Sequence, residues 1–301
     1  MVAAQAPAGC STKRWDFNSA SDMNDFVGDS CPQQGYVENG NMVWALTKEC
    51  GATTYAYNKR VNQGKIRASI KAAPTNGTVT AFIMYGFPDE KKDEIDFEWV
   101  GLDLSTARSM YFYDGKRAPT GKQEEGYHAV AGNNAGAAFN TYEIEFTDEY
   151  IRWSVNDVKV RELIYSATTA SYFPKTADRL QFGTWDGSKQ IYWAGTTDWA
   201  AIGGKTYAYM DWLEVTDYES CDGSAESSST EVVEPTTSTS ADDVDPTSSD
   251  NTAPTGGDDD DEEGEEGEGG EEEGTTSSTP SGSSSGPQPT HPPKCKPKRR
   301  H

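Results

Sequence analysis

Three carboxylates stand at alternate positions of a short segment that otherwise has the composition of a β-strand, at Glu94, Asp96 and Glu98. Successive side chains of a strand point to opposite faces, so the three carboxylates share one face and the apolar residues between them share the other. Like charges on one face repel each other, and a protein tolerates that most readily where the carboxylates do chemistry. Cleavage of a glycosidic bond with retention uses two such groups, one as nucleophile and one as acid/base.

The alternative interpretation of this segment is a solvated acidic edge strand, with Lys91 and Lys92 as counter-ions. Trp99 follows the segment directly, and the surrounding chain is rich in aromatic residues, as a sugar-binding surface requires. These two features favour the catalytic interpretation. In that interpretation Asp96 lies between the two glutamates and separates their pKa values.

Composition divides the chain into two parts. All Phe, Trp and Tyr residues lie within residues 1–221, whereas residues 222–301 consist mainly of Ser, Thr, Gly, Pro and acidic residues, with a basic end. The acidic run 258–273 is interrupted only by Gly, and the tail accounts for most of the net charge of −23. Such a segment cannot bury enough apolar surface to offset its conformational entropy. We therefore predict a catalytic domain over 1–221 and a disordered tail over 222–301.

The two ends of the chain carry few targeting signals. Residues 1–9 lack the charged start and the long apolar core of an intact signal peptide, but they resemble what remains after a cleavage site. We expect no transmembrane segment, since the chain has no apolar run of 18 residues, and we see no hydrophobic C-terminal tail for a lipid anchor. The basic end 292–301 is interpreted as a solvated terminus rather than a nucleic-acid patch, because the acidic run beside it would compete for the same charges.

Four cysteines lie in the predicted domain, at Cys10, Cys31, Cys50 and Cys221. An even number permits three pairings, and reduced buried thiols are the alternative. The ends of a compact domain often lie close together, which favours Cys10–Cys221 with Cys31–Cys50. The chain has neither a CxxC motif nor a His/Cys cluster, so we expect no metal site. Disulfides and the glycosylation sequon at Asn76 fit a secreted protein.

Apolar residues alternate with polar ones through most of the domain, and 3.6-residue periodicity is weak. Many short strands separated by Gly, Asn and Asp over some 200 residues predict an all-β fold. We expect a concanavalin-like β-jelly-roll sandwich of two antiparallel sheets, with one concave sheet lining a groove. The dipeptide 156–157 predicts a hairpin. Strands are expected at 65–71, 79–85, 94–98, 108–113, 142–146, 151–155, 158–163, 179–184 and 207–215.

The segment around the three carboxylates resembles the active-site strand of glycoside hydrolase family 16. Asp93 precedes it, and the tripeptide Trp-Val-Gly at 99–101 follows it. The flanking residues point to the Crh-type branch of that family, the fungal cell-wall transglycosylases. The likeness extends from about residue 35 to residue 218, and further matching motifs occur in order at 64–66, 71–74, 111–112, 126–128, 139–142 and 193–195.

The resemblance implies a role for each carboxylate and a family 16-like catalytic domain over 1–221 without a cofactor. Glu94 matches the nucleophile, Glu98 matches the acid/base, and Asp96 matches the assisting residue. The residues expected to contact sugar are Glu98, Gln181, Trp185, Gln190, Trp193 and Tyr111.

The chain also departs from the family pattern. Arg and Thr are common where Gln181 and Gln190 align, the loop 186–189 is short, and Met110 stands where a small polar residue is usual. These differences bear on donor length and acceptor choice rather than on the carboxylate chemistry.

The tryptophans fall into two groups by position. Trp44, Trp153 and Trp212 alternate within predicted strands and are expected in the core, whereas Trp185 and Trp193 follow strand ends beside Gly and are expected in the groove. The sequence leaves two interpretations of His128 open, a hydrogen-bond donor in the groove and a loop histidine.

Three functions are compatible with these observations. The leading hypothesis is a secreted, monomeric cell-wall transglycosylase that cleaves a β-1,4-linked chitin donor and transfers it to β-glucan or chitin. The second is an endo-acting hydrolase of β-glucan or chitin on the same fold, because hydrolysis and transfer share a glycosyl-enzyme and differ in what attacks it. The third is a non-catalytic carbohydrate-binding surface protein, which the presence of both glutamates disfavours.

Overall fold

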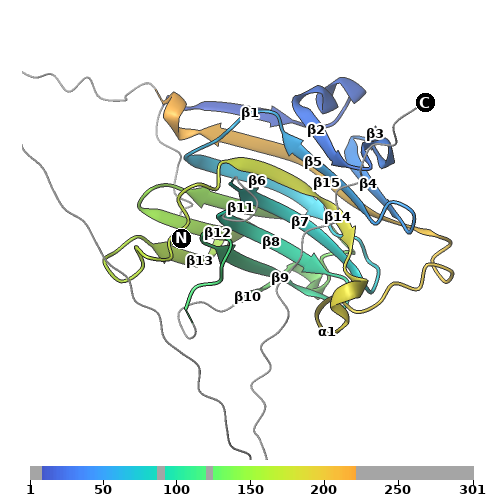
Figure 1. Ribbon diagram of the computed structural model, residues 1–301. Coiled ribbons are helices and arrows are strands. Elements are labelled where there is room, and N and C mark those ends of the chain that lie inside the picture. Colours follow the sequence, from blue (N-terminus) through green and yellow to red (C-terminus); the bar gives the residue numbers. More distant parts are fainter. Residues whose placement is uncertain (1–8, 87–91, 120–124, 222–301) are drawn as a thin grey trace, which may run out of the picture. The chain divides into compact units, whose positions relative to one another are not determined.

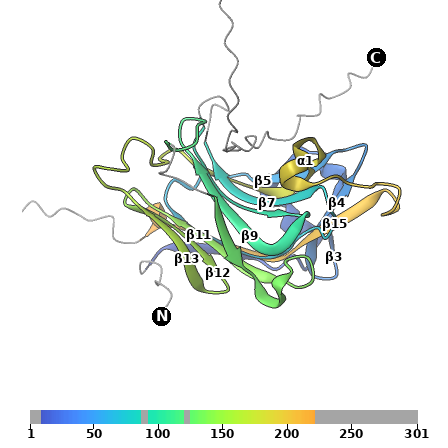
Figure 2. The same cartoon turned by 90° about the horizontal axis from the view of Figure 1, so that it is seen from below.

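Two antiparallel β-sheets pack face to face in the part of the chain that the computed structural model describes, residues 9–86, 92–119 and 125–221 (Figure 1). This is the predicted β-jelly-roll sandwich. Figure 2 separates the layers, with β5 and β7 in one and β3, β12 and β13 in the other. The predicted tail 222–301 lies outside the described residues. None of the described helices is long and apolar enough to cross a membrane.

Sheet A is the layer without the three carboxylates. Its strand order is β13-β12-β11-β6-β15-β4-β3, and β1 pairs with the far end of β15. The bounds are β1 (Ser11–Trp15), β3 (Gly35–Glu38), β4 (Asn41–Thr47), β6 (Gly64–Lys71), β11 (Asn140–Phe146), β12 (Tyr150–Val155), β13 (Val158–Ile164) and β15 (Lys205–Asp217).

Sheet B carries the three carboxylates on β8, near its middle. Its strand order is β10-β9-β8-β7-β14-β5-β2. The bounds are β2 (Phe26–Ser30), β5 (Ala52–Tyr57), β7 (Thr78–Tyr85), β8 (Glu94–Val100), β9 (Asp103–Phe112), β10 (Gly126–Ala129) and β14 (Arg179–Asp186). The helical elements are short: α1 (Ile191–Ala194) and the 3₁₀ turns Ala20–Asp25, Pro32–Gln34, Ala131–Asn133, Ser188–Gln190 and Tyr218–Ser220.

The main core lies between the sheets and consists largely of aromatic rings. Burying rings of this size supplies most of the driving force for packing two sheets. Fully buried members include Trp44, Phe82, Phe97, Trp99, Tyr142, Trp153 and Phe182. Trp44 and Trp153 thus occupy the core as predicted.

Trp212 was expected in the core, and that prediction is wrong. The pairing of β15 with β6 shifts register between Met210 and Trp212, which is the mark of a β-bulge. Met210 and Leu213 are both fully buried, so even-numbered residues face the core before the bulge and odd-numbered residues face it afterwards. Trp212 therefore faces outward. There the guanidinium of Arg14 lies 4.3 Å from the centre of the Trp212 ring.

The preferred disulfide pairing is confirmed. Cys10 bonds to Cys221, and Cys31 bonds to Cys50. The first bond follows from the topology, because β1 pairs with the end of β15 and Ser11 lies opposite Asp217.

His128 is neither in a loop nor on the face that carries the carboxylates. It lies on β10, 8% exposed, and its Nε2 is 2.8 Å from the Oγ of Ser109. Its ring meets that of Phe97 edge to face at 6.1 Å. Burial, together with the smaller effect of the positive charge of Arg161, lowers the pKa of His128 to about 4.

This histidine makes the stability of the domain depend on pH. Between pH 6.5 and 4 the unfolded chain binds a proton at His128 that the native state excludes, so the free energy of unfolding falls as the pH falls through that window. The loss attributable to His128 is about 3 kcal/mol. We predict that His128→Gln removes this part of the dependence, as measured by urea unfolding at pH 7, 5.5 and 4. If the free energy of unfolding falls equally steeply with decreasing pH in the variant and in the parent, the prediction is wrong.

Candidate active site

The three predicted carboxylates share one face of β8. From Glu94 to Glu98 the strand pairs without interruption with β7 on one side and β9 on the other. The alternation of side chains is therefore preserved, and Ile95 and Phe97 point into the main core. The opposite side of sheet B, which carries Glu94, Asp96 and Glu98, is called the carboxylate face below.

A tryptophan from the other sheet holds the backbone of the strand that carries the three carboxylates. The Nε1–H of Trp153 on β12 donates to the carbonyl oxygen of Asp96 at 3.0 Å, through the core. Trp153 is fully buried, so this bond connects the two sheets at the centre of the carboxylate segment. Any shift of β8 relative to sheet A would break it.

Asp96 is the most buried of the three carboxylates, at 2% exposure. Its Oδ1 accepts the backbone N–H of Met110 at 2.8 Å, whereas its Oδ2 has no hydrogen-bond partner among the described residues. Burial raises the pKa of Asp96 well above its usual value, and the charge of Glu94 raises it further, against the lowering effects of the Met110 N–H and of Arg161.

Glu98 is partly exposed and lies directly opposite Arg108 on β9. Burial raises the pKa of Glu98 well above its usual value, and the charges of Asp96 and Glu94 add to the rise. The positive charge of Arg108 acts in the opposite direction. A glutamate with a raised pKa keeps its proton to higher pH than an ordinary glutamate, which suits the role of proton donor.

Glu94 stands at the start of β8 and is 7% exposed. Its Oε2 lies 3.5 Å from the Nζ of Lys92, so a positive charge accompanies this buried carboxylate. The adjacent Asp93 accepts the backbone N–H groups of Asp114, Lys175 and Thr176 at 2.8, 2.6 and 2.9 Å. Asp93 thereby ties two loops to the end of the strand from which Glu94 projects.

The predicted sugar-binding residues are distributed unevenly. Gln181 and Trp185 lie on β14 in register with the carboxylate face, and Trp185 stacks on Trp193 at 6.0 Å. The Gln181 amide donates to Asp29 at 2.6 Å. Gln190 is buried in the 3₁₀ turn before α1. Their contact with sugar remains a prediction.

Tyr111 was expected to contact sugar, and the structure contradicts this. It pairs with Ile95 on β8, so its side chain points into the core, where it is 2% exposed and 6.3 Å from the ring of Trp153. The parity of β9 explains the error, because on the carboxylate face its residues are Arg108, Met110 and Phe112.

The prediction from sequence missed a polar cluster beside Glu98. Arg108 is 8% exposed and pairs with Glu125, Nη1 to Oε1, at 3.6 Å. Glu125 also accepts the Nε1–H of Trp193 at 3.3 Å and the hydroxyl of Tyr127 at 2.9 Å. Only the register of β8 and β9 reveals this cluster, and no local motif signals that register.

A sandwich that presents two glutamates and an aspartate on one strand, beside stacked tryptophans, is the architecture of an enzyme that acts on glycosidic bonds. The family model for "Glycosyl hydrolases family 16" matches residues 24–201. The chain therefore belongs to glycosyl hydrolase family 16.

The chain is similar to several curated fungal proteins. It is 31% identical to Crh-like protein 2 of Aspergillus fumigatus, over 68% of this chain and 46% of the relative. It is 28% identical to Congo red hypersensitive protein 2 of Saccharomyces cerevisiae, over 63% of this chain and 42% of the relative. The chain thus spans less than half the length of these relatives.

Solved structures show the same fold. The Crh5 transglycosylase in complex with NAG superposes with a TM-score of 0.60 at 28% identity, over 70% of this chain and 86% of that one. The β-glucanase of Bacillus licheniformis has a TM-score of 0.57 at 19% identity, over 70% of this chain and 99% of that one, and shares the fold.

The proximity of the carboxylates predicts a specific pH response for Asp96→Asn. The substitution removes one of the charges that raise the pKa of Glu98, so Glu98, the predicted proton donor, ionises at lower pH. We expect the basic limb of kcat/KM against pH to move to lower pH, together with a loss of rate. Glu143→Gln, on the opposite side of the sandwich, is the matched control. A basic limb that stays in place in Asp96→Asn would contradict the prediction.

Proposed function

We propose that this chain is a retaining transglycosylase of fungal cell-wall polysaccharide, with Glu94 as nucleophile, Glu98 as acid/base and Asp96 as the assisting residue. The observation that supports it best is the uninterrupted pairing of β8 from Glu94 to Glu98, which keeps all three carboxylates on one face within a family 16 domain.

The reaction has two steps. In the first, a carboxylate oxygen of Glu94 bonds to the anomeric carbon, the glycosidic C–O bond breaks, and Glu98 gives its proton to the departing oxygen. In the second, the hydroxyl of an acceptor sugar attacks the same carbon, Glu98 takes the hydroxyl proton, and Glu94 leaves as a carboxylate. The charge of the buried Asp96 raises the pKa of Glu98, so that after the first step Glu98 readily takes up the proton of the acceptor hydroxyl.

Chitin is the proposed donor, and β-glucan or chitin is the proposed acceptor. The NAG in the Crh5 transglycosylase structure is the sugar unit of chitin, and that protein is 28% identical to this chain. Trp193 stacks on the buried Trp185, donates to Glu125 in the polar cluster, and offers an aromatic surface for a pyranose.

The proposed location is the cell wall, after secretion. Two disulfides form most readily in an oxidising compartment. Asn76, the acceptor residue of the glycosylation sequon, is exposed, and the hydroxyl of Thr78 in that sequon is held by the carbonyl of Thr75 at 2.6 Å.

A second candidate is hydrolysis of β-glucan or chitin by the same carboxylates. The family model is one of glycosyl hydrolases, and the two reactions differ only in whether water or a sugar attacks the glycosyl-enzyme. Product analysis separates them.

The catalytic assignment predicts that Glu94→Gln and Glu98→Gln each lower the rate by several orders of magnitude, because each removes one member of a unit that acts together. The assay incubates chitin oligosaccharide with labelled β-glucan oligomer and measures product masses. Hybrid products indicate transfer, and shortened chains indicate hydrolysis. Near-parental activity in either folded variant would refute the assignment.

The aromatic wall gives a separate prediction. Trp193→Ala should raise KM for chitin oligomers roughly fivefold, since stacking contributes about 1 kcal/mol. Tyr111→Phe is the matched core variant and should leave KM unchanged. An unchanged KM in Trp193→Ala would show that Trp193 does not contact the chitin oligomer.

A further inference from the structure

A row of side chains crosses the outer face of sheet A, on the far side of the sandwich from the carboxylates. Tyr36 on β3 lies opposite Val43 on β4, Val43 lies opposite Tyr209 on β15, and Tyr209 lies opposite Lys71 on β6. The inward neighbours Trp44, Ala208, Met210 and Ile70 are fully buried, so the members of the row lie on the outer side of the sheet, where Val43 is covered by its neighbours and is 1% exposed.

Phe139 extends the row by one more strand. It precedes β11, whose first residue, Asn140, pairs with Ile70, so Phe139 comes next to Lys71. The Lys71 ammonium lies 5.2 Å from the centre of the Phe139 ring and 4.3 Å from that of Tyr209. Tyr36 and Phe139 are 39% and 37% exposed, and Tyr209 is partly exposed.

The rings occur on every second strand of the sheet. Tyr36, Tyr209 and Phe139 belong to the first, third and fifth positions of the path β3-β4-β15-β6-β11. Neighbouring strands are about 4.8 Å apart, so rings on alternate strands repeat at about 9.6 Å. Tyr207 adds a fourth ring beside Tyr209, at 6.4 Å.

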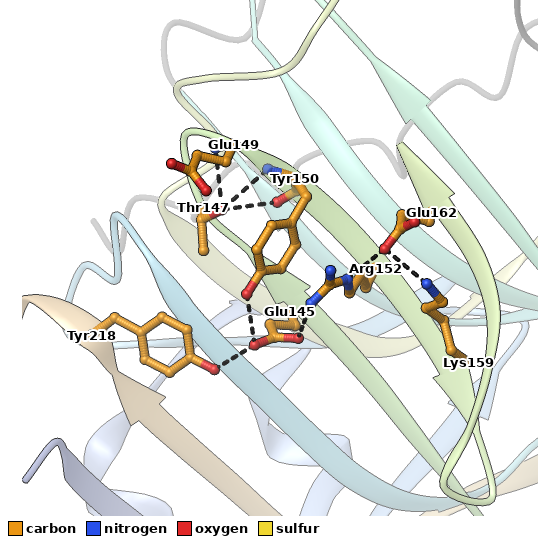
Figure 3. A network of polar contacts seen from close by, with 8 residues as sticks. All are labelled: Glu145, Thr147, Glu149, Tyr150, Arg152, Lys159, Glu162 and Tyr218. Atoms are coloured by element: carbon orange, nitrogen blue, oxygen red, sulfur yellow. Dashed lines mark hydrogen bonds and ion pairs between the residues drawn. The ribbon is translucent and has the colours of Figure 1, made fainter. Parts of the chain in front are cut away.

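The charge of the row differs from that of the rest of the outer face. Elsewhere the outer face carries ions that pair with each other, such as Glu145, Arg152 and Glu162 in the network of Figure 3. The row itself contains a single charge, Lys71, whose ammonium lies against two rings, and the carboxylate of Glu38 on β3 lies near Tyr36 and Tyr209. A row with one cation does not match a polyanion such as a nucleic acid, whereas it matches a neutral chain with apolar faces and hydroxyl groups.

We propose that the row Tyr36–Tyr209–Phe139 is a second polysaccharide site, which binds a β-1,4-linked chain of N-acetylglucosamine along the path of the rings. In such a chain successive sugars are turned over, so alternate units present the same face, and their separation is close to that of alternate strands. Each ring then stacks on one unit of every pair. The choice of chitin as the polymer rests on the proposed function.

The test measures binding of purified Glu94→Gln protein, which cannot turn over its ligand, to insoluble chitin and to insoluble β-1,3-glucan. Adding Tyr209→Ala should weaken binding to chitin about tenfold. It should leave binding to β-1,3-glucan unchanged, because that polymer is helical and lacks the alternate-unit repeat. Tyr36→Ala, on the edge strand β3, is the second row variant, and melting temperatures verify that both fold.

Tyr165→Ala is the matched control, since Tyr165 is 42% exposed and lies outside the row. Equal chitin binding by Tyr209→Ala, Tyr36→Ala and Tyr165→Ala would overturn the proposal, as would equal losses on both polymers. Failure of the proposed function is a different result: the parent enzyme would then make neither hybrid nor shortened chains, whatever the row variants bind.

Discussion

The regular pairing of β8 is the constraint on which the rest of the site depends. Three carboxylates on one face repel each other, and only a strand held on both edges and from behind keeps them together. Trp153 holds it from behind by donating to the carbonyl of Asp96. Asp93 holds the start of the strand by accepting the backbone N–H of Lys175. Burial, and after it the repulsion between the crowded charges, raises the pKa values of Asp96 and Glu98, which is the property that acid/base chemistry uses.

The sequence was informative where one local rule decides the outcome. Alternation predicted β6, β11, β12 and β13, and the dipeptide 156–157 adopts the positive φ angles of a tight hairpin. Strands β4 and β5 escaped prediction for a physical reason. Strands such as β5 are buried on both faces, so they show no alternation of apolar and polar residues.

The site was predictable to the same extent. The carboxylate pattern is contained in five residues, so the sequence alone predicted that Glu94, Asp96 and Glu98 share one face, and the pairing of β8 confirms this. The error at Tyr111 and the missed Arg108 both concern β9. Its register with β8 decides which of its side chains lie on the carboxylate face, and that register cannot be read from β9 alone. The error at Trp212 has the same origin, because one inserted residue reverses which side chains face inward.

The bond between Cys10 and Cys221 has a mechanical consequence. It joins the chain just before β1 to the chain just after β15, so the entire sandwich lies inside one covalent loop. A pull applied between the segments before residue 10 and after residue 221 passes through the sulfur–sulfur bond and leaves the hydrogen bonds of both sheets unloaded. At the proposed location, in a wall that stretches as a cell grows, tension on this chain would not unfold the strand that carries its carboxylates.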